Sequence, residues 1–118
     1  EFRTTSGFRV LVGRNNRQND KLTKSAGPRD IWLHTQKIHG SHVILWLDGG
    51  EADAQSLTEA AVLAATFSQA REGSKVPVDY TMVRNVKKPS GALPGKVIYT
   101  NYETIMAAPD KTLAEKVK

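Results

Sequence analysis

The sequence contains no cysteine, which excludes disulfide bonds and thiolate metal sites. It also lacks any apolar run approaching the roughly 20 residues that a membrane-spanning helix needs, and no signal-peptide pattern opens the chain. We therefore expect no membrane partner. A reducing compartment fits the lack of cysteine, and we expect a cytoplasmic location.

The length leaves room for one hydrophobic core. The 118 residues are too few for two cores, so we expect a single domain over residues 1–118. With 39% hydrophobic and 25% charged residues, the composition is that of an ordinary globular fold. Because the first residue is not methionine, we expect a domain cut from a longer protein. The ends, residues 1–6 and 110–118, are predicted to be flexible.

Acidic residues are scarce in two parts of the chain, so the net charge of +5 is unevenly distributed. Residues 1–40 carry eight Lys and Arg against three acids, and residues 75–100 carry five against Asp79 alone. Residues 41–74 carry one Arg against five acids, and residues 101–118 are balanced. If the two basic blocks meet in space, they form one positive face suited to a polyanion. The alternative is that the basic charge serves solubility alone.

Hydrophobic alternation and turn residues predict an α+β fold. Its sheet is expected to be mainly antiparallel and mixed, with one main helix packed on it and a short helix near the N-terminus. Strands are predicted at residues 8–12, 30–35, 42–47, 76–86, 97–100 and 104–108. The crossover through the main helix allows one parallel strand pair.

The two predicted helices carry recognisable start signals. Asn15 or Asn16 caps the short helix, which extends to about Lys24. The main helix is predicted from Ser56 to about Arg71, because Ser56-Leu-Thr-Glu59 has the spacing of a capping box and an alanine-rich stretch follows. The last residues, from Lys111, are either frayed or a terminal helical turn.

The segment Gly13-Arg-Asn-Asn16 lies where the first strand passes into the short helix. Backbone amides at that helix start, with Arg14 and Arg17 beside them, are able to bind a phosphate oxygen. The alternative is that Asn15 and Asn16 only cap the helix while the arginines are solvated. The segment lacks the glycines and the lysine of a P-loop, so nucleotide hydrolysis is not supported.

The strand Asp30-Ile-Trp-Leu-His34 alternates aliphatic and aromatic residues. Ile31 and Leu33 are expected to face the core, which leaves Trp32 and His34 on the opposite face of the sheet. An exposed Trp32 would be able to stack on a base. Burial beneath the main helix is the alternative and is favoured, because tryptophan is highly buried on average.

His34, His39 and His42 are the three histidines of the chain, and their clustering raises the question of a metal. They lack the helical spacing of a known His motif, and no cysteine can complete a site. We therefore expect no metal and no cofactor. Ser41 beside His42 lacks a nucleophile elbow and an oxyanion hole, so we expect no enzymatic activity.

A second basic segment, Lys87-Lys-Pro-Ser-Gly91 followed by Pro94-Gly-Lys96, is stiffened by two prolines. Its lysines are point charges for phosphate and carry no base information. The alternative is a connection that carries solubilising charge. The predicted nucleic-acid-binding residues are Arg14, Asn15, Asn16, Arg17, Lys21, Arg29, His34, His42, Lys87, Lys88 and Lys96.

The chain resembles the NFACT-R domain of bacterial NFACT ribosome-quality-control proteins, which are often named fibronectin-binding proteins. Four blocks carry the resemblance: GRNNRQND, DIWLHTQKIHGSHVIL, LTEAAVLAATFSQAR and VPVDYTMVRNVKKPSGALPGKVIY. The match extends from about Gly7 to Pro109, nearly the whole chain. The family usually has proline before Gly-Ser-His where this chain has His39, so we assign His39 no role. The family positions that this sequence matches are Arg14, Asn15, Asn16, Asp20, Asp30, Trp32, His34, Gly40, Ser41, His42, Lys87, Lys88, Pro89, Gly91, Pro94, Gly95 and Tyr99.

The resemblance implies a cytoplasmic factor that binds the large ribosomal subunit carrying a stalled peptidyl-tRNA. Such proteins recruit alanyl-tRNA and support the addition of C-terminal alanine tails, and this domain is regarded as their RNA-binding module. The expected partners are therefore tRNA, the large ribosomal subunit and other domains of the same protein. Two alternatives remain: a protein-interaction or fibronectin-binding adhesion module, and an enzyme that uses the histidines.

Overall fold

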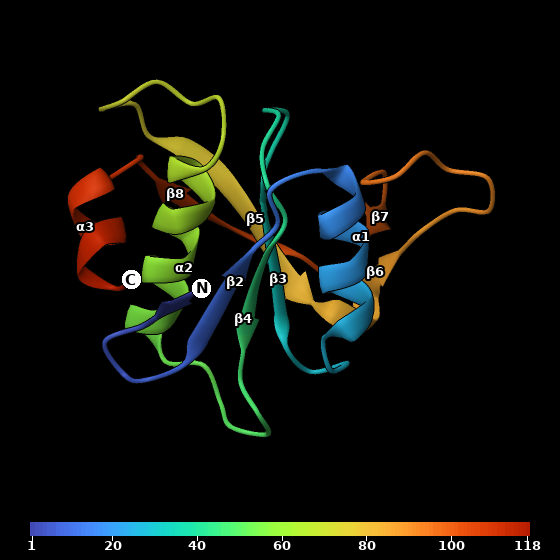
Figure 1. The fold of residues 1–118 in the computed structure, drawn as a ribbon, viewed down its shortest axis with the longest axis horizontal. Helices are drawn as coiled ribbons and strands as arrows, with labels where there is room; N and C mark the ends of the chain where they lie inside the picture. The colour runs from blue at the N-terminus through green and yellow to red at the C-terminus, as the bar shows by residue number, and fades with distance from the viewer.

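The structure, a computed structural model, describes residues 1–118 and consists of a six-stranded sheet with helices on both faces (Figure 1). The strand order is β1-β2-β4-β3-β5-β8, and every neighbouring pair is antiparallel. Helices α2 and α3 cover one face, and α1 and the β6–β7 ribbon lie on the other. The elements are β1 Phe2–Arg3, β2 Arg9–Val12, α1 Asn16–Ser25, β3 Ile31–Thr35, β4 Val43–Trp46, α2 Ala54–Thr66, β5 Val76–Met82, the 3-10 turn Val83–Asn85, β6 Val86–Lys87, β7 Ile98–Tyr99, β8 Glu103–Ala107 and α3 Lys111–Lys116.

The predicted α+β fold with a mainly antiparallel sheet is confirmed, but the parallel strand pair does not form. After β4 the chain crosses through α2 and returns on the far side of β3, so β5 pairs with β3 and never meets β4. None of the helices combines the length and the apolar character that a membrane-spanning segment requires.

Alternation along the central strand β3 determines what each face of the sheet carries. Leu33 is fully buried and packs with Val43 and Leu45 of β4 in the main core, which α2 covers. Trp32 pairs with Ile44 on one side and with Thr81 on the other, and lies on the opposite face. The sheet therefore has an aliphatic face beneath α2 and an aromatic face beneath α1 and the β6–β7 ribbon.

The start of α2 differs from the predicted capping box. Asp53 is the N-cap residue and accepts a hydrogen bond from the Ser56 amide, so the helix begins before Ser56. The Ser56 hydroxyl instead donates to Thr4 Oγ1 at 2.9 Å, and the Glu59 carboxylate accepts from the amide and hydroxyl of Thr5. The prediction was wrong because tertiary partners from the N-terminal segment occupy both side chains.

The end of α2 comes at Thr66, five residues before the predicted Arg71. The Ser68 hydroxyl bonds to the carbonyl of Ala65, and Ser68 forms an isolated bridge with Gly40 of the β3–β4 connection. A Cβ on Gly40 would lie 2.9 Å from the Ser68 Cβ, so only glycine fits this approach. The bridge ties the end of α2 to the rim of the site described below.

Both terminal segments that we expected to be flexible contact the body of the domain. Phe2 is buried, and the amide of Arg3 donates to the carbonyl of Val117 at 2.6 Å. Ala114 and Val117 are 9% and 7% exposed, and Figure 1 shows the two chain ends close together. The expectation of flexibility concerns motion and stays a prediction.

Candidate nucleic-acid interface

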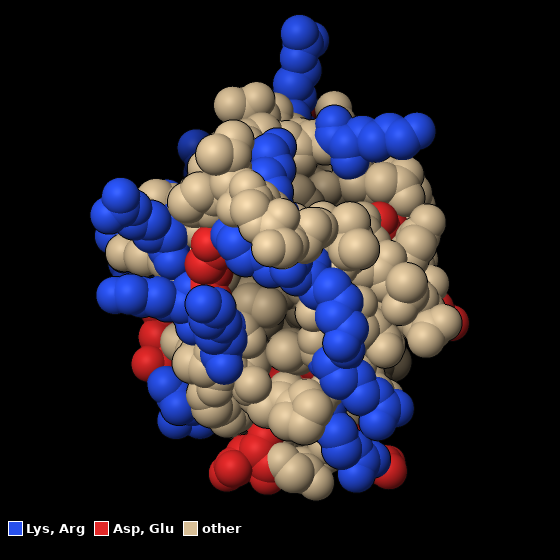
Figure 2. Space-filling model, turned by 90° about the vertical axis from the view of Figure 1, so that its right-hand side faces the viewer, with Lys and Arg blue, Asp and Glu red and all other residues tan.

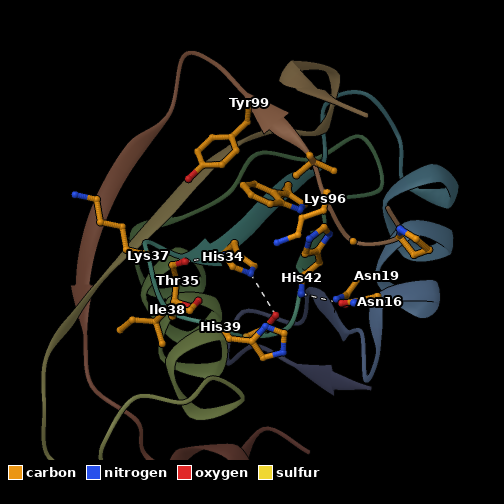
Figure 3. Close-up of a pocket in the computed structure, with 15 residues that line it drawn as sticks. Asn16, Asn19, His34, Thr35, Lys37, Ile38, His39, His42, Lys96 and Tyr99 are labelled. Atoms are coloured by element: carbon orange, nitrogen blue, oxygen red, sulfur yellow. Dashed lines mark hydrogen bonds between the residues drawn. The ribbon is translucent and has the colours of Figure 1, made fainter. Parts of the chain in front are cut away.

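A pocket of about 380 Å³ opens on the aromatic face of the sheet, between α1 and the loop that links β6 to β7 (Figure 3). Its floor comes from β3 and from His42 just before β4, and the β3–β4 connection closes one end. The lining residues are Asn16, Asn19, Trp32, His34, Thr35, Lys37, Ile38, His39, Gly40, His42, Pro94, Gly95, Lys96, Val97 and Tyr99. The two basic blocks of the sequence therefore meet at one cavity.

Four aromatic rings pack together in this pocket. Trp32 stacks on His34 with ring centroids 5.8 Å apart and an interplanar angle of 6°. His42 meets the Trp32 ring edge-on at 5.3 Å, and Tyr99 lies 4.7 Å from the same ring. Trp32 is 1% exposed, so the favoured prediction of burial is right, although α2 does not cover it. Its indole is a wall of the pocket and not an open stacking platform.

Two of the three pocket histidines, His34 and His42, have pKa values that burial lowers. Burial lowers the pKa of His42 to about 4, and the neighbouring His34 adds to this effect. Burial also lowers the pKa of His34, whose Nδ1 lies 2.6 Å from the Thr35 carbonyl oxygen and whose Nε2 lies 3.2 Å from that of Gly40. Burial therefore favours the uncharged form of both rings on the pocket floor.

Tyr99 is fixed at the pocket by a buried carboxylate. Its hydroxyl donates to Asp79 Oδ2 at 2.5 Å, and Asp79 also accepts from Thr104 and from the side-chain amide of Gln36. Burial and the hydrogen bond to Asp79 raise the pKa of Tyr99 well above its usual range. Asp79 is 1% exposed and thus orients Tyr99 without lining the pocket itself.

An acid of α1 attaches the β6–β7 loop to the rest of the domain. Asp20 accepts from the Gly95 amide at 3.0 Å and from the Lys88 ammonium at 2.6 Å. Partial burial opposes ionisation of Asp20, but these two hydrogen bonds lower its pKa overall. Gly95 has φ +83°, and a Cβ there would lie 2.8 Å from Asn16 Oδ1, so glycine is required where the loop meets the helix. These two hydrogen bonds of Asp20, which we call the Asp20 clamp, position Pro94 and Lys96 at the pocket.

The start of α1 borders a second, smaller hollow of about 220 Å³ that shares four lining residues with the first. Asn15 caps the helix by accepting from the Gln18 amide at 2.9 Å, as one of the two predictions stated. Asn16 is the first helical residue and lines both cavities, while Arg14 lines the smaller one. Packing requires glycine at position 13, because a Cβ on Gly13 would lie 1.9 Å from Asn19 Oδ1.

The predicted cations of this face differ in where they lie relative to the pocket. Figure 2, which looks onto the side of α1 and the β6–β7 ribbon, shows Lys and Arg side chains around a hollowed centre. Lys96 lines the pocket, and in Figure 3 its side chain extends across the mouth toward His34. Lys21 lies on the side of α1 that faces β2, and Arg29 is exposed in the turn before β3. Lys88 alone among the predicted cations forms a salt bridge; the others, which have none, are Arg14, Arg17, Lys21, Arg29, Lys87 and Lys96.

Several residues of the site were not predicted from the sequence. Asn19 is 4% exposed, and its Oδ1 accepts from the His42 amide at 3.1 Å, which joins α1 to the pocket floor. Lys37 and Tyr99 line the pocket, as does His39, to which we assigned no role. Of these residues, only Tyr99 could have been found from the sequence, since it matches a family position. The structure brings no three His, Asp or Glu side chains together in a metal-binding group.

The fold and this site define an α+β domain with a cationic, aromatic-floored pocket on one face. The family model for the NFACT protein RNA binding domain matches residues 1–101, so the chain belongs to the NFACT RNA-binding domain family. The resemblance seen in the sequence is thereby confirmed. This chain is 50% identical over 118 residues to the Rqc2 homolog RqcH of Bacillus subtilis (strain 168), covering 99% of the chain and 20% of that protein.

Other relatives show how widely the domain occurs. The chain is 42% identical over 110 residues to RqcH of Streptococcus pneumoniae, covering 92% of the chain and 20% of that protein. It is 32% identical over 89 residues to coiled-coil domain-containing protein 25 of Bos taurus, covering 71% of the chain and 43% of that protein. The chain spans about a fifth of the length of the RqcH relatives.

A solved structure has the same fold. The C-terminal part of the fibronectin/fibrinogen-binding protein from Streptococcus suis superposes with a TM-score of 0.93 at 37% sequence identity, covering 99% of this chain and 47% of that one. The likeness extends over the whole domain.

Proposed function

We propose that this domain binds RNA through the face formed by α1, the β3–β4 connection and the β6–β7 loop. One observation carries the proposal: Lys37 from the first basic block and Lys96 from the second line one pocket without an acidic partner, and Figure 2 shows further Lys and Arg side chains around the same hollow. Such unpaired Lys and Arg neutralise phosphates and release counterions. Membership of an RNA-binding domain family supports the same function.

We further propose that the RNA is tRNA or ribosomal RNA on a large ribosomal subunit, within a cytoplasmic ribosome-quality-control factor that supports C-terminal alanine tailing. Support comes from the RqcH relatives, whose name marks them as homologues of Rqc2. In this proposal the domain acts by binding alone, carries no catalysis, and docks against other domains of a longer chain.

Fluorescence anisotropy with labelled tRNA tests this function. We expect tight binding at low salt and a linear fall of log affinity with log salt, with a slope of about −0.7 to −0.9 per phosphate contacted. The absence of binding at low salt would contradict the proposal for the isolated domain.

A second candidate function is adhesion, which the name of the Streptococcus suis structure favours. Immobilised fibronectin provides the direct comparison in the same buffers. Salt-resistant binding to fibronectin without RNA affinity would reverse the order of the two functions.

A further inference from the structure

One polar group among the residues that line the pocket has no hydrogen-bond partner. Trp32 is 1% exposed and lines the cavity, and its Nε1–H is buried without a hydrogen-bond acceptor. A buried Trp N–H usually finds a partner, because an unmet donor loses its hydration without compensation. A ligand that brings an acceptor into the cavity would satisfy it.

The walls of the pocket favour a flat, uncharged ring. The rings of Trp32, His34, His42 and Tyr99 pack against one another with centroids 4.7 to 5.8 Å apart. Burial favours the uncharged form of both histidines, since it lowers the pKa of His42 to about 4 and lowers that of His34 as well. Aromatic surroundings with hydrogen-bonding edges are how proteins hold unstacked bases.

The charge around the pocket changes from floor to rim. No acidic residue lines the cavity. Lys96 and Lys37 lie at its edge, and Figure 3 shows the Lys37 side chain extending outward from the centre. A neutral floor with a cationic edge fits a ligand whose ring enters and whose negative charge stays outside.

We propose that this pocket takes one unstacked nucleotide of a single-stranded stretch of RNA, with its base inside the aromatic-lined cavity and its phosphate near Lys96. The inference rests on the proposed RNA-binding function and adds which structural form of RNA is recognised. The cavity of about 380 Å³ lies within the range of roughly 300–1,000 Å³ that small-ligand sites occupy. Bases inside a duplex are stacked and cannot enter such a pocket.

The two tryptophans of the chain allow a direct test by NMR. Trp46 lies outside the pocket, with the Arg9 guanidinium 5.6 Å above its ring, so Trp46→Phe leaves Trp32 as the only indole reporter. This variant is titrated with a short single-stranded RNA of mixed sequence, with the same strand in a duplex, and with nucleoside monophosphates. We expect the single strand to shift the Trp32 Nε1–H resonance and slow its hydrogen exchange, and we expect the duplex to leave both unchanged.

Trp32→Phe provides the matched chemical test, because it keeps an aromatic ring and removes the donor. We expect its affinity for the single strand to fall about tenfold while its affinity for the duplex stays the same. The amide spectrum reports whether the variant is folded. If Trp32→Phe is not folded, the Trp32 indole resonance of the Trp46→Phe protein is the test that decides.

The remaining outcomes show whether this inference fails alone or together with the proposed function. Salt-dependent RNA binding with an unmoved Trp32 indole would overturn the nucleotide pocket and leave RNA binding intact. No binding of any RNA would overturn both. Monophosphates that bind as tightly as the strand would also overturn the inference, because the pocket would then serve free nucleotides.

Discussion

His42 lies beneath the pocket as a base that the fold keeps uncharged. Its ring is packed against Trp32 and His34, its amide is bound by Asn19, and its Nδ1 lies 3.3 Å from the hydroxyl of Thr23. Because burial lowers the pKa of His42 from 6.5 to about 4, protonation of this ring opposes folding. The residue thus links the stability of the site to pH.

The first prediction concerns this link. Between pH 6.5 and about 4 the unfolded state binds one more proton at His42 than the folded state, so stability falls as the pH is lowered through this window. Acidification from about pH 7 to about pH 5 is expected to cost the domain about 2 kcal/mol through His42. Urea unfolding of wild type and His42→Gln at both pH values measures it. The variant should lose less stability on acidification than the wild type. An identical loss in both proteins would show that His42 does not determine this pH dependence.

The second prediction concerns the hydroxyl of Tyr99. Tyr99→Phe removes a donor from the buried carboxylate of Asp79, which keeps Thr104 and Gln36. We expect a loss of about 1–3 kcal/mol in the free energy of unfolding, because an anionic acceptor loses a charge-assisted hydrogen bond. Tyr102→Phe is the control, since Tyr102 is 48% exposed. Equal stabilities of the two variants would show that Asp79 does not depend on Tyr99.

At the scale of elements, the site depends on a loop that α1 holds in place through Asp20. The ribbon that carries this loop is short, with only two residues in each of β6 and β7. Two paired residues per strand provide little stability on their own. The contacts of Asp20 with Gly95 and Lys88 therefore determine where Lys96 lies.

The third prediction tests this clamp. Asp20→Ala removes both acceptors, so we expect faster hydrogen exchange at the Gly95 amide and weaker RNA binding, with the rest of the fold retained. Glu72→Ala, at an exposed acid in the α2–β5 connection, is the control for the change in net charge. If the Gly95 amide exchanges at the wild-type rate in Asp20→Ala, the loop is held by other contacts.

Local sequence signals located most elements, and tertiary contacts explain where they did not. The strands around Trp32 and the alanine-rich helix follow from periodicity and composition. The predicted capping box does not form, because Ser56 and Glu59 make hydrogen bonds to residues more than fifty positions away. The site was predictable only in part: its cations formed visible blocks, whereas the role of Asn19 depends on how α1 packs against the segment before β4.

For the whole molecule, the domain is polarised between its two ends. The helix α3 lies at the opposite side from α1 and the β6–β7 ribbon (Figure 1), and the unpaired cations predicted to bind RNA belong to the latter half. The charge blocks of the sequence meet because β3 and β4 bring residues 31–46 beneath both α1 and the β6–β7 loop.

The fourth prediction compares these two ends. Replacing Arg14, Lys87 and Lys96 by glutamate is expected to weaken tRNA binding strongly and to reduce the salt slope by about 1 for each lost contact. Lys88 is left unchanged, because its reversal would break the Asp20 clamp. The matched control replaces Lys75, Lys111 and Lys118, which are exposed and lie outside the pocket. Equal effects in both triple variants would show that binding follows net charge alone.

The most direct test of RNA binding at this face is an amide-shift titration of the domain with tRNA at low salt. We predict that the shifted amides cluster at residues 13–19, 34–42 and 87–97, around the pocket and the start of α1. Shifts confined to α3 and the chain ends, or no shifts at all, would contradict an RNA interface on this face.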